Sequence, residues 1–176
     1  MRTTLIVLLM ALVIPVAFGQ SKVTKENVPG ITNLARLETT VACAGAVKAS
    51  AVAEIKKMGF KAIFNFRLAT EQGADIEGET AAAKDAGIAF FHMPLSGSMP
   101  DPTVVDKFVK TIAEPGNQPA FIHCASGNRA SALWYVKRVL VDKWEDDKAM
   151  AEATELGAMS AGMKTFVVDY VKAHRK

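Results

Sequence analysis

Short apolar runs alternate with helical stripes along most of the chain. The runs at residues 61–67, 88–93 and 120–122 predict strands, the last of them a buried strand that stops at a cysteine and small residues. Residues 31–43 predict one or two further extended segments. Apolar residues at helical spacing predict helices at residues 49–58, 79–86, 129–141 and 145–156, and over the stripe Met163, Phe166, Val167, Tyr170 and Val171. Asp101-Pro102 predicts the start of another helix, with the aspartate as the cap and the proline in the first turn.

This order of elements predicts an α/β fold. Strands that alternate with helices favour a central, mainly parallel sheet covered by helices on both faces, which gives three layers. Ligands of such sheets bind beyond the carboxyl ends of the strands. The loops after Arg67 and Met93 and the segment that begins at Cys124 should all emerge at that edge.

The N-terminus differs from the rest of the chain. Arg2 precedes an apolar run at residues 5–18, and Ala17 and Gly19 have the spacing of a signal-peptidase site. We therefore expect residues 1–19 to be a signal peptide, 20–30 a polar, flexible lead-in and 31–176 a single domain. The mature protein would be periplasmic or secreted and not stably associated with a membrane. An uncleaved N-terminal anchor is the alternative, although the run is short and contains Pro15.

Charge and histidine content exclude some kinds of partner. The formal net charge is +3, and it falls to about +2 without Arg2; no basic stripe is present, so nucleic-acid binding is not expected. His92, His123 and His174 are too scattered to indicate a metal site, and no cofactor is implied.

The most informative stretch is residues 120–131, in which a buried strand ends at Cys124 and a helix begins near Arg129. Four small or polar residues lie between them: Ala125, Ser126, Gly127 and Asn128. Their backbone N–H groups should surround a concavity at the helix N-terminus, where unpaired donors and the helix dipole favour an anion. The same field favours the nucleophilic thiolate of Cys124, and the planar fork of Arg129 suits phosphate or sulfate.

His123-Cys124, Gly127 and Arg129 together resemble the signature loop of cysteine-dependent protein tyrosine and dual-specificity phosphatases. Those enzymes usually have five residues between cysteine and arginine, whereas this chain has only the four named above. Four is typical of rhodanese sulfurtransferases and of a bacterial phosphatase-like family related to a domain of the beta-lactamase hydrolase-like proteins. Residues 59–67, followed by Glu71, resemble the Gly-Phe, strand, Asn-Leu-Arg pattern of that bacterial family, and the upstream rhodanese segments are missing. The phosphatase-like family is therefore favoured, with the resemblance covering roughly residues 34–141.

The resemblance implies a dual-specificity phosphatase-like fold and hydrolysis of a phosphate monoester, on a protein or a small molecule, through a cysteinyl-phosphate. Cys124 would be the nucleophile, Arg129 and the loop amides would bind the phosphate, and His123 would support the thiolate. Asp101 is the one carboxylate on the loop where the family carries its general acid, although capping of a helix explains it equally well. Arg67 either offers a second cation to the substrate or pairs with Glu71, which is also an available partner for Arg129.

Several features leave other interpretations open. Ala130 stands where phosphatases often carry a hydroxyl, with Ser131 one residue later, so turnover could be weak. A rhodanese-type sulfurtransferase with a persulfide on Cys124, and a non-catalytic oxyanion-binding module, are the alternative functions. Cys43 is either a small buried apolar residue or the partner of Cys124 in a reversible disulfide.

Overall fold

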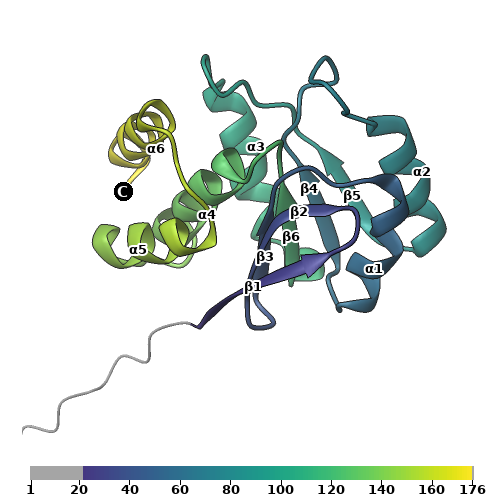
Figure 1. Cartoon of the computed structure of the whole chain (residues 1–176). Helices are drawn as coiled ribbons and strands as arrows, with labels where there is room; N and C mark the ends of the chain where they lie inside the picture. Colours follow the sequence, from purple (N-terminus) through teal and green to yellow (C-terminus); the bar gives the residue numbers. More distant parts are fainter. Residues whose placement is uncertain (1–21, 176) are drawn as a thin grey trace, which may run out of the picture.

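The computed structural model describes residues 22–175, so the predicted signal peptide at residues 1–19 lies outside the described residues. Within these residues, six strands form one sheet, and six α-helices and two short 3-10 helices connect and cover them (Figure 1). The strands are β1 (Val23–Val28), β2 (Ile31–Leu37), β3 (Val41–Ala44), β4 (Ala62–Asn65), β5 (Ala89–His92) and β6 (Ala120–His123). The helices are α1 (Val52–Lys57), α2 (Ile76–Ala86), α3 (Pro102–Ile112), α4 (Asn128–Leu140), α5 (Asp146–Leu156) and α6 (Ala161–His174), with the 3-10 helices at Ala49–Ala51 and Pro115–Asn117.

The sheet order brings the predicted site loops to one edge. The strands lie in the order β1-β2-β3-β6-β4-β5; β3, β6, β4 and β5 are parallel to one another, and β1 and β2 pair antiparallel. In the register, Asn65 of β4 lies beside both His92 of β5 and His123 of β6. The three parallel strands that precede the loops at 66, 93 and 124 therefore end at the same level, as predicted.

The two faces of the sheet carry separate apolar cores. On one face α1 and α2 cover a core that contains Ile55, Ile63 and Phe121. On the other face α3, α4, α5 and α6 cover a larger core centred on Trp134 and Phe64 (Figure 1). The predicted three-layer α/β fold with a mainly parallel sheet is confirmed, and among residues 22–175 no helix is both long enough and apolar enough to cross a bilayer.

Two boundaries differ from the sequence prediction. The stretch expected to be a lead-in contains strand β1, which pairs antiparallel with β2 and forms an edge of the sheet. Helix α2 begins three residues earlier than predicted, at Ile76, because the side chain of Asp75 accepts a hydrogen bond from the Gly78 N–H and caps the helix. The earlier start places Glu79, which was predicted to be the first residue of the helix, within its first turn.

Candidate active site

Cys124 begins a tight turn between β6 and α4. Its N–H donates to the carbonyl of Ala44 over 3.3 Å, which extends the sheet pairing by one residue. Gly127 then adopts a φ of 100°, a left-handed conformation that favours glycine, and precedes the first residue of α4. This turn directs the Gly127 N–H to the Cys124 sulfur at 3.2 Å. The sulfur therefore lies inside the loop, and its side chain has no exposed surface.

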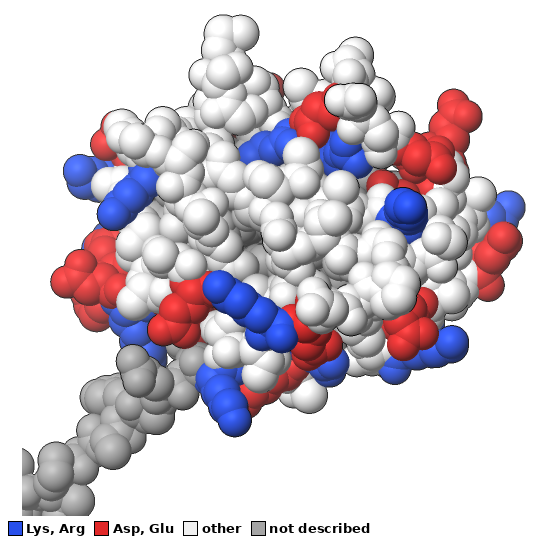
Figure 2. Space-filling view, viewed as in Figure 1, with Lys and Arg blue, Asp and Glu red and all other residues white. Residues whose placement is uncertain are grey.

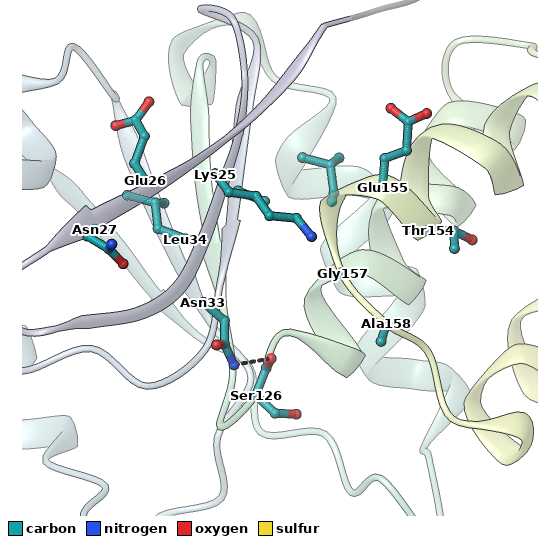
Figure 3. A pocket seen from close by; sticks show the side chains of 12 residues that line it. Lys25, Glu26, Asn27, Asn33, Leu34, Ser126, Thr154, Glu155, Gly157 and Ala158 are labelled. Carbon is teal, nitrogen blue, oxygen red and sulfur yellow. Dashed lines mark hydrogen bonds between the residues drawn. The ribbon is translucent and has the colours of Figure 1, made fainter.

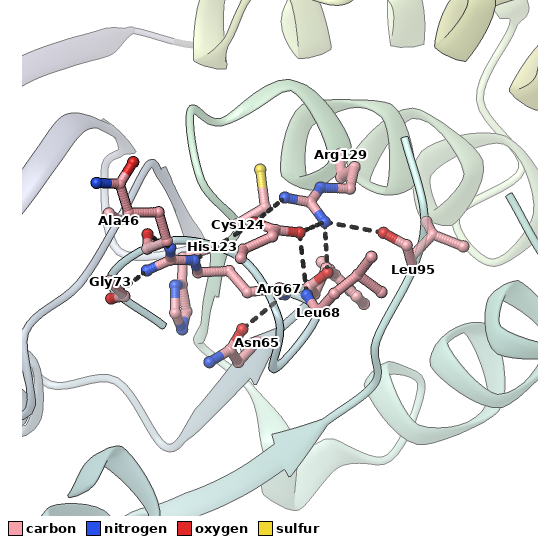
Figure 4. Close-up of polar contacts among 12 residues, drawn as sticks. Ala46, Asn65, Arg67, Leu68, Gly73, Leu95, His123, Cys124 and Arg129 are labelled. Carbon is pink, nitrogen blue, oxygen red and sulfur yellow. Dashed lines mark hydrogen bonds and ion pairs between the residues drawn. The ribbon is translucent and has the colours of Figure 1, made fainter. Parts of the chain in front are cut away.

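Arg129 lies in the first turn of α4, with 6% of its surface exposed. Its Nη1 donates to the carbonyls of Phe66 and Leu95, both at 2.9 Å, and to Glu71 Oε1 at 2.5 Å. Its Nη2 donates to Glu71 Oε2 at 2.8 Å, which completes a bidentate pair. Figure 4 shows the Arg129 guanidinium near Cys124, with its hydrogen bond to the Leu95 carbonyl drawn as a dashed line. Two loops that follow neighbouring strands thus fix the guanidinium on one side, and the Glu71 partner considered from the sequence is the one it has.

The charges of this pair support each other. Burial alone would lower the pKa of Arg129, but the hydrogen bond from it to Glu71, together with the adjacent Cys124 thiol and Glu71 charge, raises that pKa above its ordinary value. Burial would likewise raise the pKa of Glu71, but hydrogen bonds from Arg129 and the Leu68 N–H and the charges of both arginines lower it. Arg129 therefore stays cationic while it is anchored.

Arg67 holds the loop that carries Glu71. Its side chain is 3% exposed; Nη1 donates to the Gly73 carbonyl at 2.8 Å, and Nη2 donates to the Gln72 carbonyl at 2.6 Å. Its Nε lies 3.5 Å from Glu71 Oε2. The pairing alternative considered from the sequence is thus present, and these contacts use three of the five N–H donors of the guanidinium. Direct substrate binding by Arg67 stays a prediction.

His123 is fully buried on the α2 side of the sheet, away from the loop opening. Its Nε2 lies 3.0 Å from Glu79 Oε2, a carboxylate that the sequence analysis did not single out. Asn65 Nδ2 donates to the same oxygen at 3.2 Å. A lone glutamate in an alanine-rich helix gives no sequence signal by itself, so this contact became visible only when the strand order was known.

Asp101 is exposed and caps α3. Its Oδ1 accepts from the Thr103 N–H at 2.9 Å and from the Thr103 hydroxyl at 2.8 Å. The capping role considered from the sequence is therefore present. The loop before it, which contains Leu95, contacts Arg129 through the Leu95 carbonyl. Asp101 thus follows a segment that touches the site, and its role as general acid stays a prediction.

The β1-β2 hairpin and the α5–α6 linker support the outer side of the loop. Asn33 Nδ2 donates to the Ser126 carbonyl at 3.2 Å (Figure 3). Asn128 accepts from the Ser160 N–H at 2.8 Å and donates to its hydroxyl at 3.3 Å. Between these supports lies a groove of about 480 Å³ that Ser126 helps to line. Of the predicted loop residues, Ala125 and Ser126 are exposed beside it.

Cys43 lies in the same core as Cys124. Both cysteines are free thiols and both are buried. Burial, and secondarily the neighbouring Cys124, raise the pKa of the Cys43 thiol far above its ordinary value. The buried apolar interpretation of Cys43 therefore describes the structure. Among residues 22–175, no group of three or more His, Cys, Asp or Glu side chains could hold a metal ion.

Solved structures of other proteins have the same fold as this chain. The chain has the fold of a DUF442 protein from Shewanella putrefaciens CN-32, with 16% identity, a TM-score of 0.68, and 82% of this chain and 95% of that one covered. TpbA from P. aeruginosa is 20% identical with a TM-score of 0.63, covering 88% of this chain and 91% of that one. The core catalytic domain of the PP-IP phosphatase SIW14 from S. cerevisiae, also 20% identical, has a TM-score of 0.65 and covers 82% of this chain and 88% of that one.

Comparison of the sequence identifies a family, although no individual curated protein matches. Residues 33–141, well over half of the chain, match the family described as the phosphatase-like domain of beta-lactamase hydrolase-like protein, nearly the span of the resemblance seen in the sequence. The matched region contains the whole Cys124–Arg129 loop, Glu71 and Asp101. The chain therefore belongs to the phosphatase-like domain family of the beta-lactamase hydrolase-like proteins.

Proposed function

We propose that the protein is a cysteine-dependent phosphatase that hydrolyses phosphate monoesters through a cysteinyl-phosphate on Cys124. The observation that carries this proposal is the position of Cys124, whose sulfur accepts a hydrogen bond from the Gly127 N–H, next to an arginine that Glu71 holds in a bidentate pair. A sulfur nucleophile, amide donors and a fixed guanidinium are the groups that phosphoryl transfer through a thiolate requires.

The hydrogen bonds of Arg129 leave donors for a ligand. A guanidinium has five N–H donors. Glu71 and the carbonyls of Phe66 and Leu95 take those of Nη1 and one of Nη2. The Nε–H and the second Nη2–H are the donors that would bind phosphate oxygens as negative charge develops on them.

In this mechanism the Cys124 thiolate attacks phosphorus, the S–P bond forms and the ester P–O bond breaks. The leaving oxygen takes a proton from a general acid, for which Asp101 is our candidate. Water then attacks the cysteinyl-phosphate, which releases inorganic phosphate and restores the thiolate. Because Ala130 replaces the hydroxyl that often follows the arginine, we expect the second step to be slow.

The surroundings of the loop favour a substrate with a single phosphate. The groove beside Ser126 carries one cation, Lys25, together with Glu26 and Glu155 (Figure 3). On the face of the molecule shown in Figure 2, basic and acidic side chains are interspersed. A polyphosphate would need a cluster of cations, so we propose a phosphorylated protein or a small phosphomonoester as the substrate. The signal peptide predicted at residues 1–19 would place this activity in the periplasm or outside the cell.

Three assays on the mature chain test the proposal against the two alternatives. Release of phosphate from para-nitrophenyl phosphate that is abolished by Cys124→Ser supports a phosphatase. Formation of thiocyanate from thiosulfate and cyanide, without phosphate release, would instead indicate the sulfurtransferase. Phosphate binding measured by calorimetry, with neither activity, would indicate a non-catalytic oxyanion-binding module.

A further inference from the structure

Glu79 is a fully buried charged residue that the mechanism above does not use. It lies in the first turn of α2, and its side chain has no exposed surface. Taking a carboxylate fully out of water costs several kcal/mol, on the order of the penalty for any buried ion, unless partners compensate it. An apolar side chain of similar volume would fill the position without that cost.

The partners of Glu79 come from the two central strands. Asn65 and His123 lie side by side in the register of β4 and β6. Both side chains point toward α2, where Glu79 Oε2 accepts from Asn65 Nδ2 at 3.2 Å and lies 3.0 Å from His123 Nε2. Glu79 Oε1 and both ring nitrogens of His123 have no hydrogen-bond partner among the described residues, so the 3.0 Å approach of Glu79 to Nε2 is a close polar contact without hydrogen-bond geometry. We call Asn65, Glu79 and His123 the buried polar triad.

The buried polar triad connects to both halves of the site. Asn65 Oδ1 accepts from the Arg67 N–H at 2.8 Å, and Arg67 holds the loop that carries Glu71. The His123 carbonyl accepts from the Phe66 N–H at 2.9 Å, and the next residue after His123 is the nucleophile. A shift of the His123 ring would therefore reach Cys124 through a single peptide unit.

We propose that Glu79 is a positioning residue for Cys124 and acts through His123. This inference rests on the phosphatase function proposed above. The carboxylate holds the imidazole ring in one orientation between α2 and the strand ends, and the ring in turn fixes the peptide that carries the nucleophile. A group of this kind improves reaction geometry at the expense of stability, which explains why a charged side chain occupies an apolar position.

The test compares activity with stability. Glu79→Met removes the carboxylate but retains a side chain of similar length; we expect kcat on para-nitrophenyl phosphate to fall on the order of tenfold or more, as it does when outer supports of a site are lost, with KM unchanged. The melting temperature should stay the same or rise. Glu79→Gln retains the size and an acceptor oxygen and should lose less of kcat than Glu79→Met. The matched control is Glu77→Met, an exposed position of the same helix, which should have wild-type kinetics.

A double-mutant cycle tests the route through His123. In a His123→Asn background, Glu79→Met should cost little further activity, because the ring that it positions is already absent. Equal losses in both backgrounds, or wild-type kcat in both Glu79→Gln and Glu79→Met, would overturn the proposal.

A second measurement separates this inference from the proposed function. The rate of Cys124 alkylation by iodoacetamide at pH 6 reports the nucleophile without any ester substrate. If wild-type protein hydrolyses no ester but Glu79→Met still slows alkylation, the positioning role stands and the phosphatase proposal fails. An unchanged alkylation rate would refute the positioning role, whatever the activity of the wild-type protein.

Discussion

The pair between Glu71 and Arg129 should determine both stability and activity, and Glu71→Gln tests it with the least change in shape. In the wild-type protein two charge-assisted hydrogen bonds, of 2.5 and 2.8 Å, join a side chain that is 8% exposed to one that is 22% exposed. An amide in place of the carboxylate turns one acceptor into an N–H donor that faces the guanidinium.

The magnitude follows from the burial of the two groups. Hydrogen bonds to charged groups contribute about 1.5–3 kcal/mol each, and partial exposure of Glu71 reduces the total, so we expect Glu71→Gln to lower the free energy of unfolding by about 2 kcal/mol. For a chain of this size that corresponds to a fall of about 4–8 °C in melting temperature. A displacement of Arg129 by about 1 Å can cost on the order of a hundredfold in rate, so kcat/KM should fall by about that factor.

The same variant has a defined pH dependence. The pKa of Glu71 is lower in the folded protein than its usual value, so its contribution to stability is complete above the usual pKa of about 4.3 and is lost as the pH falls through the lowered value. The stability difference between wild type and Glu71→Gln should be constant from about pH 5 to pH 7, where the carboxyl group is ionised in both the folded and the unfolded chain. It should shrink below about pH 4.

Urea unfolding across this pH range and kinetics on para-nitrophenyl phosphate measure both effects. Glu54→Gln is the matched control, because Glu54 pairs with Lys57 at 3.3 Å on the exposed surface of α1, where ion pairs contribute little. Wild-type stability and kcat/KM in Glu71→Gln, or a stability difference that does not change between pH 7 and pH 3, would refute the reasoning.

Three further predictions concern the nucleophile, the acid and the support of the loop. Phosphate should slow the alkylation of Cys124 by iodoacetamide, because it would occupy the same loop; an alkylation rate that phosphate does not change would indicate an inert cysteine outside an anion site. Asp101→Asn should leave kcat on para-nitrophenyl phosphate nearly unchanged but lower it about a hundredfold on phenyl phosphate, whose leaving group needs a proton; equal effects on both esters would exclude the acid role. In Gly157→Ala the new Cβ would lie 3.2 Å from the Gly127 carbonyl oxygen, so the substitution should displace the loop and lower kcat/KM several-fold. Wild-type kinetics would show that the α5–α6 linker moves to accommodate the methyl group without displacing the loop.

The parts of the fold that could be predicted are those with a local pattern. The apolar runs of β4, β5 and β6 and the Asp101-Pro102 start of α3 are contiguous signals, and the structure confirms them as elements, with β4 and β6 buried and β5 a partly exposed edge strand. β1 has no such signal, because this edge strand has several exposed polar residues between partly buried ones. α2 begins early because Asp75 caps it, and the stretch around it had been interpreted as loop.

The site divides in the same way. The Cys124–Arg129 loop is continuous in sequence and could be predicted as an anion cradle. Arg129 pairs with Glu71, which lies 58 residues away in the sequence. The sequence alone could therefore name Glu71 only as a possible partner of Arg129 or of Arg67. Glu79 meets His123 because α2 packs beneath the end of β6, which no local pattern encodes. Sequence thus indicates which groups perform the chemistry, whereas the groups that hold them depend on the strand order.

The most direct test of the account is to trap the intermediate. Wild-type mature protein is mixed with para-nitrophenyl phosphate, quenched in acid within milliseconds to seconds, and the peptide that contains residues 120–131 is analysed by mass spectrometry. The account predicts a phosphoryl group on Cys124 that is absent from Cys124→Ser and accumulates further in variants whose hydrolysis step is slowed. Release of phosphate with no phosphoryl group on Cys124 at any time, or equal release by Cys124→Ser, would contradict it.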